Sequence, residues 1–99
     1  MAKIDNNNAK ATKITVGQIK AICIRTLNTL NMDPDRYLPE IYKDRERGRI
    51  FVDATDWINF RVAVDINSDA TWGDIKSYIA EWFAVYKTRC INLGETFED

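Results

Sequence analysis

The chain of 99 residues contains no histidine, and this absence excludes more chemistry than any other feature of its composition. Histidine is the commonest general base, metal ligand and proton relay in proteins near neutral pH. Serine is scarce as well, because Ser68 and Ser77 are the two serines of the chain and neither lies in a Gly-x-Ser-x-Gly motif. A Ser-His-Asp or Cys-His arrangement is therefore impossible, and we expect a protein that is not an enzyme.

Cysteine and glycine are also few, with two cysteines and four glycines. Cys23 and Cys90 each fall on the apolar face of a predicted helix, where a free thiol packs as a small hydrophobic residue. Two isolated cysteines without an imidazole exclude the usual zinc sites. The glycines are scattered and form no phosphate-binding loop. We expect neither a cofactor nor a metal ion.

One segment imitates a calcium-binding loop. Asp65, Asn67 and Asp69 have the spacing of the first three calcium ligands. The sixth position, where such loops need glycine, is Ala70, and the twelfth, where a glutamate completes the site, is Lys76. We therefore interpret the segment as a polar turn between a strand and a helix.

Long apolar runs are missing from the chain, so we expect no membrane partner. The net charge of −1 gives no general attraction to nucleic acid or to anionic lipid. Residues 1–14 are polar and lack the apolar segment of a signal peptide. We expect a cytoplasmic protein with reduced thiols.

The length and the hydrophobic fraction of 45% indicate one globular domain with a single core. We expect a flexible polar arm over residues 1–14, the globular domain over 15–94 and an acidic tail over 95–99. The predicted fold class is α+β, with a helix, a short helix, a β-hairpin and a long C-terminal amphipathic helix in that order. A mostly helical protein with a short hairpin is the alternative.

The first helix is predicted over residues 16–31. Thr15 and Gln18 have the spacing of a capping box, in which each side chain accepts a free backbone N–H of the first turn. Apolar residues then recur every three or four positions. The pair Asp33-Pro34 ends this pattern and is typical of a new helical turn.

The next segment is expected to be an irregular turn over 34–38 and a short helix near 39–46. That short helix would place Leu38, Ile41 and Tyr42 toward the core. Gly48 is expected to end it.

A hairpin is predicted from a strand at Ile50–Val52 and a second strand over 57–66. Apolar and polar residues alternate along 57–66, which is typical of a strand with one buried face. The competing interpretation is a helix capped by Asp53 that packs four residues on one side, namely Trp57, Phe60, Arg61 and Val64.

The longest predicted element is an amphipathic helix over Thr71–Leu93. Thr71 and Asp74 have capping-box spacing, and Gly94 has the usual place of a helix stop. The apolar residues of this helix step by three or four, namely Trp72, Ile75, Ile79, Trp82, Phe83, Tyr86 and Cys90.

These aromatic residues are more numerous than two short helices and a hairpin are expected to cover. We therefore expect a non-enzymatic protein–protein interaction module, as an adaptor, an inhibitor or a small oligomeric component, with a phage or mobile element as a candidate origin. The partner would be another protein, including a second copy of the chain. The candidate binding residues are Trp57, Trp72, Trp82, Phe83 and Tyr86. The alternative is that these side chains fill the core.

A second hypothesis is a winged-helix-like regulator that binds DNA. Two helices followed by a basic turn and a hairpin have the order of that fold. The segment Gly48–Val52 resembles the wing of excisionase-type proteins, and the similarity covers about ten residues, in the basic turn and hairpin Lys43–Val52. Phosphate contacts would come from the lysine-bearing N-terminal arm and from Lys43, Arg45, Arg47 and Arg49.

Overall fold

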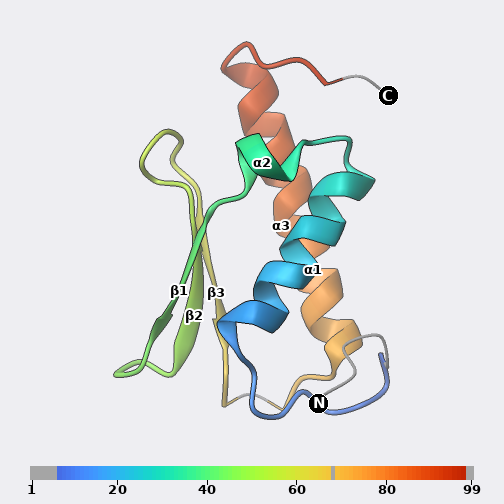
Figure 1. Ribbon diagram of the computed structural model, residues 1–99, viewed down its shortest axis with the longest axis vertical. Coiled ribbons are helices and arrows are strands. Elements are labelled where there is room, and N and C mark those ends of the chain that lie inside the picture. The colour runs from blue at the N-terminus through green and yellow to red at the C-terminus, as the bar shows by residue number, and fades with distance from the viewer. Residues whose placement is uncertain (1–6, 68, 98–99) are drawn as a thin grey trace.

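Two long helices, α1 (Val16–Thr29) and α3 (Trp72–Asn92), pack together on one face of a three-stranded antiparallel sheet (Figure 1). This computed structural model describes residues 7–67 and 69–97. The short helix α2 (Pro34–Tyr37) links α1 to the strands β1 (Glu40–Asp44), β2 (Arg49–Asp53) and β3 (Arg61–Asp65). The predicted α+β fold class, with its long C-terminal helix, is confirmed.

Helix α1 begins with the predicted capping box. Gln18 N–H donates to Thr15 Oγ1 at 3.2 Å, and Thr15 N–H donates to Gln18 Oε1 at 2.9 Å. The helix ends two residues earlier than expected, because Asn31 adopts a left-handed conformation with φ of 59°. Its buried face consists of Ile19, Ile22, Cys23 and Leu27.

The prediction of an irregular turn followed by a helix over 39–46 is wrong. Residues 34–37 form α2, in which Asp33 accepts the N–H of Asp35 at 3.0 Å. Leu38, which precedes Pro39, is extended with φ of −63° and ψ of 119°, as a residue before proline prefers. The chain then leaves α2 as strand β1, which pairs with β2 over its whole length.

The predicted hairpin is confirmed as the antiparallel pair β2–β3, although its second strand is shorter than the predicted 57–66. Residues 54–60 form a turn in which the carbonyl of Ala54 accepts the N–H groups of Trp57 and Ile58 at 3.3 and 3.0 Å. The competing helical interpretation of this segment is wrong. Trp57 therefore lies on a turn and not on a strand.

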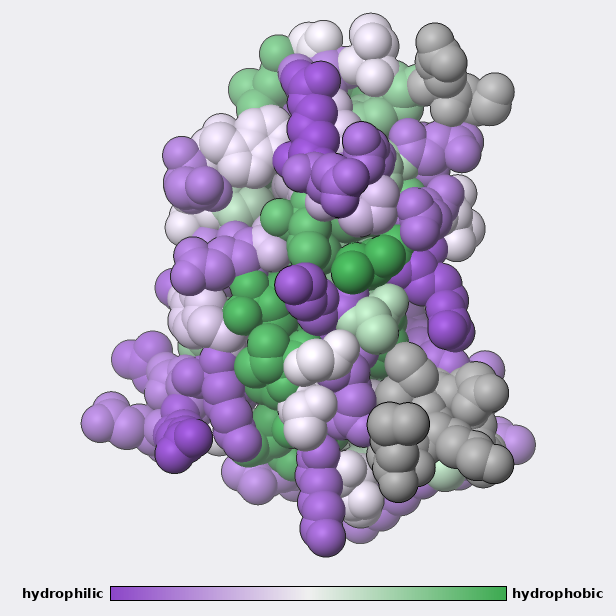
Figure 2. Space-filling model, viewed as in Figure 1, coloured by the Kyte–Doolittle hydropathy of each residue, from purple (hydrophilic) through white to green (hydrophobic). Residues whose placement is uncertain are grey.

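Alternation along the strands separates the two faces of the sheet. Ile50 and Val52 of β2 join the core beneath the helices, together with Val62 and Val64 of β3. Phe51 lies on the opposite face, where the ring of Tyr42 and the guanidinium of Arg61 cover it at 5.5 and 5.0 Å. Figure 2 shows hydrophobic side chains in a band between the helices and the sheet, flanked by hydrophilic ones.

Helix α3 supplies the largest side chains of the core. Thr71 and Asp74 form the predicted capping box at its start, and Gly94 follows its end with φ of 98°. Its buried residues are Trp72, Ile75, Ile79, Phe83, Tyr86 and Cys90. The ring of Tyr86 stacks on Phe60 at 4.7 Å, and its hydroxyl donates to the carbonyl of Tyr37 at 2.7 Å.

Residues 7–14 pack against the start of α3, so the expected flexible arm is wrong for this segment. Ala11 N–H donates to the carbonyl of Ala70 at 2.9 Å, and Trp72 N–H donates to the carbonyl of Ala9 at 3.0 Å. Ala11 and Ile14 are buried in the core. Residues 1–6 of the expected arm lie outside the described residues.

The expected acidic tail contacts α2 through its first residues. The carboxylate of Glu95 accepts hydrogen bonds from Arg36 at 2.9 Å and from the Tyr37 hydroxyl at 2.6 Å. The ring of Phe97 lies 5.0 Å from that of Tyr37. Residues 98 and 99 lie outside the described residues.

The hydrogen bond between Tyr86 and Tyr37 links α3 to α2 inside the core. Tyr86→Phe leaves the carbonyl of Tyr37 without this donor, so it should lower the free energy of unfolding by about 1–2 kcal/mol. Urea denaturation measures the change. Tyr78→Phe is the matched control, because the Tyr78 hydroxyl makes no hydrogen bond to the described residues. Equal stability of the two variants would contradict this account.

Candidate functional site

The structure divides the five predicted binding residues between the core and the surface. Trp72, Phe83 and Tyr86 are buried, because they lie on the face of α3 that turns toward α1 and the sheet. Their prediction as partner-binding residues is wrong, and they form the core instead. Trp57 and Trp82 keep 42% and 37% of their surface exposed.

These two exposed tryptophans belong to different surroundings. The ring of Trp57 contacts Tyr37 and Tyr86 at 6.2 and 6.1 Å, next to α2. The ring of Trp82 contacts Tyr78 at 6.5 Å, one turn away on α3. The predicted residues therefore form no common surface. The exposed neighbours of Trp82 are residues other than the predicted ones.

The α3 stripe is the set Tyr78, Trp82 and Val85, which are exposed by 38%, 37% and 37%. Their spacing of four and three residues places them on one face of the helix. This face adjoins the core face but is separate from it. Tyr78 and Val85 were missed by sequence reasoning, although the recurrence at 78, 82 and 85 is the signal that would have found them.

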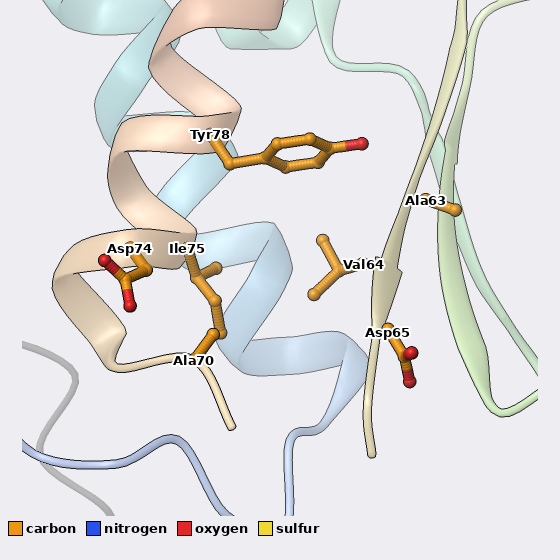
Figure 3. Close-up of a pocket in the computed structure, with 7 residues that line it drawn as sticks. All are labelled: Ala63, Val64, Asp65, Ala70, Asp74, Ile75 and Tyr78. Carbon is orange, nitrogen blue, oxygen red and sulfur yellow. The ribbon is translucent and has the colours of Figure 1, made fainter. Parts of the chain in front are cut away.

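Tyr78 connects the α3 stripe to the sheet. Its ring extends from α3 toward β3 across a cavity of about 380 Å³ (Figure 3). The cavity lies between the helix and the strand, and it is lined by Ala63, Val64, Asp65, Ala70, Asp74, Ile75 and Tyr78. One end of the α3 stripe thus lies beside the C-terminal half of β3.

Arg89 marks the other end of the same side of α3. Its guanidinium donates to the carbonyl of Asn59 and lies 6.0 Å from the centre of the Phe60 ring. Since Asn59 and Phe60 directly precede β3, α3 runs antiparallel to the strand. The α3 stripe therefore extends along the length of β3.

Strand β3 is an edge of the sheet, whose order is β1-β2-β3 within the described residues. Ala54 N–H donates to the Phe60 carbonyl at 2.9 Å, and Ile66 N–H donates to the Gly48 carbonyl at 3.0 Å. Along a strand, the backbone groups of successive residues point alternately toward one neighbouring strand and toward the other. Because Phe60 and Ile66 bond to the β2 side, the even-numbered residues of β3 bond to β2. The N–H and C=O groups of Arg61, Ala63 and Asp65 point away from it.

The solvent face of the sheet differs from this edge because its polar groups satisfy one another. Tyr42 donates to the Asp53 carboxylate at 2.9 Å, and Thr55 donates to it through its hydroxyl and its N–H. The hydrogen bonds from Thr55 hold the pKa of Asp53 below its usual range. Among residues 7–67 and 69–97, no exposed large hydrophobic side chain lies on this face.

The four basic residues of the DNA-binding hypothesis do not form one surface. Lys43 pairs with Ile50 and shares its face of the sheet, whereas Arg49 lies on the opposite face. Arg47 is 3.6 Å from the carboxylate of Asp44. The segment that resembles an excisionase wing lies largely in the central strand of the sheet, with a partner on each side.

The calcium-like segment and the two thiols make contacts within the protein. Asp65 accepts the N–H of Asn67 at 2.8 Å, and Asp69 forms an ion pair with Lys10 at 2.8 Å. Burial raises the pKa of the Cys23 thiol to about 12 and that of the Cys90 thiol to about 11. Within residues 7–67 and 69–97, no three potential ligand side chains are grouped to hold a metal ion.

Comparisons with protein-family models, with curated proteins and with solved structures gave no match. None of the helices in the described part of the chain has the length and apolar character needed to cross a membrane. The surface formed by the α3 stripe and the β3 edge is thus identified by its physical character alone.

The raised pKa values of the two thiols predict that both are inert. At pH 8 in native buffer, Cys23 and Cys90 should react with Ellman's reagent more than about a hundredfold slower than an unperturbed thiol. Both should react fully in guanidinium chloride. Absorbance at 412 nm follows the reaction, and a thiol that reacts rapidly in the folded protein would contradict the burial described above.

Proposed function

We propose that this protein is a non-enzymatic interaction module that binds protein through the α3 stripe and the edge of β3. The single observation that carries the proposal is their adjacency. Two aromatic side chains and a valine are exposed in a row on a helix, directly beside an edge strand whose outward backbone groups have no backbone partner among the described residues.

Both parts of this surface gain free energy from contact with protein. Tryptophan and tyrosine are the residues most enriched among those that dominate binding energy at interfaces. An open strand edge offers a row of N–H and C=O groups to another strand, and natural proteins normally cover or block such edges. A partner strand on β3 would therefore satisfy the backbone while the α3 stripe contributes apolar contact.

The charge distribution supports a protein partner over nucleic acid. The solvent face of the sheet carries Arg49 and Arg61 against four acidic residues, which are Glu40, Asp44, Asp53 and Asp65. A nucleic-acid interface needs a continuous basic surface. We retain the role of an adaptor, an inhibitor or a component of an oligomer.

A photo-crosslinking amino acid at position 82 or 78 tests the proposal in cells that naturally make the protein. Benzoylphenylalanine keeps the aromatic character of Trp82 and Tyr78, so binding should survive the replacement. Each variant should give one discrete covalent protein product, which electrophoresis and mass spectrometry identify. Variants at Thr29 and Glu46, two exposed positions outside α3 and β3, are the controls.

A product that forms equally at Thr29 or Glu46 would contradict a binding role for this surface. Absence of any product from positions 82 and 78 would contradict it as well. Circular dichroism of each purified variant verifies that the fold is unchanged.

A further inference from the structure

We propose that the partner is a second copy of this chain, and that the two β3 strands pair antiparallel around a twofold axis at Ala63. The inference rests on the proposed function, because it names the occupant of the surface formed by the α3 stripe and the β3 edge. Three features of the described residues specify this arrangement: the backbone register, the charges of β3 and the position of the α3 stripe.

The outward N–H and C=O groups of β3 belong to Arg61, Ala63 and Asp65, as the bonds at both ends of the β2–β3 ladder show. In an antiparallel pair centred on Ala63, Ala63 faces Ala63 and Arg61 faces Asp65. All outward groups of one copy then meet outward groups of the other, which forms a continuous six-stranded sheet.

The charges of β3 select this register. Arg61 and Asp65 lie two residues on either side of Ala63, on the solvent face of the strand. Self-pairing centred on Ala63 places each Arg61 directly opposite the Asp65 of the other copy, twice by symmetry. A shift of the axis to residue 62 or 64 places Ala63 opposite Arg61 or Asp65 and loses both charge pairs.

The opposite face of the strand is equally self-complementary. Val62 of one copy lies opposite Val64 of the other, and both belong to the core layer beneath the helices. The apolar layer of one protomer would therefore continue into the next through these valines. The cavity beside Tyr78 opens along this same seam.

The α3 stripe completes the interface. Because α3 runs along β3 from Val64 back to Asn59, the twofold axis at Ala63 brings the two α3 helices together antiparallel on one face of the sheet. Because Tyr78 lies beside Ala63, the two Tyr78 side chains approach each other near the axis, and Trp82 and Val85 of each copy extend toward the N-terminal end of the other α3. Strand pairing and helix contact are two layers of one isologous interface.

The backbone part of the interface is tested by proline at the edge. Ala63→Pro removes an outward N–H that β2 does not use, and edge strands tolerate proline. Sedimentation velocity over a dilution series of the full chain should show the wild type at twice 11.5 kDa and Ala63→Pro at 11.5 kDa. Lys43→Pro is the matched control, because it removes an outward N–H from β1, and it should remain a dimer.

The register is tested by exchange of charges. Arg61→Asp and Asp65→Arg each place like charges opposite each other, so each variant alone should be a monomer. An equimolar mixture of the two should form a heterodimer, in which every pair is again of opposite sign. Thermal unfolding of each variant shows whether it remains folded, and the double variant Arg61→Asp/Asp65→Arg should regain the homodimer.

These outcomes separate the inference from the proposed function. A wild type that is a monomer at every concentration, together with a crosslinked product of another mass from position 82, would overturn self-pairing and leave the interaction surface intact. A dimer that survives Ala63→Pro, or a mixture that does not associate, would overturn the β3 register. Loss of all crosslinked products would overturn both.

Discussion

Helix α3 carries apolar side chains on two adjacent faces, and the rest of the domain covers only one of them. The first face, with Trp72, Phe83 and Tyr86, closes the core against α1 and the sheet. The second face, the α3 stripe, remains exposed beside an open strand edge. Burial of apolar area contributes about 25 cal/mol per Å², so contact at this face would be favourable. The fold and the proposed function both depend on this division.

Features set by local sequence were predicted well. The capping boxes at Thr15 and Thr71 fixed the starts of α1 and α3, because each needs only residues three positions apart. The strand β1 was missed because its stability comes from pairing with β2, which no local pattern reveals. Residues 7–14 were misplaced for the same reason, since their polar composition hides the burial of Ala11 and Ile14.

The site was predicted in part. Among the five aromatic residues considered, Trp82 belongs to the surface proposed for binding, whereas Trp72, Phe83 and Tyr86 are core residues. Periodicity shows that a helix has an apolar face, but not where other elements cover it. The proposed pairing of Arg61 with Asp65 could be inferred only from the register of β3, which shows which backbone groups point outward. The register depends on the pairing of β3 with β2, which the sequence of a single segment does not reveal.

Amide hydrogen exchange measured residue by residue over a range of protein concentrations is the most direct test of the central claim. If two copies pair through β3, the amides of Arg61, Ala63 and Asp65 will be protected at high concentration and will lose protection on dilution. The amides of Val62 and Val64 will stay protected throughout. Exchange of the Ala63 amide that is as fast at high concentration as that of the outward Lys43 amide on β1 would contradict the account.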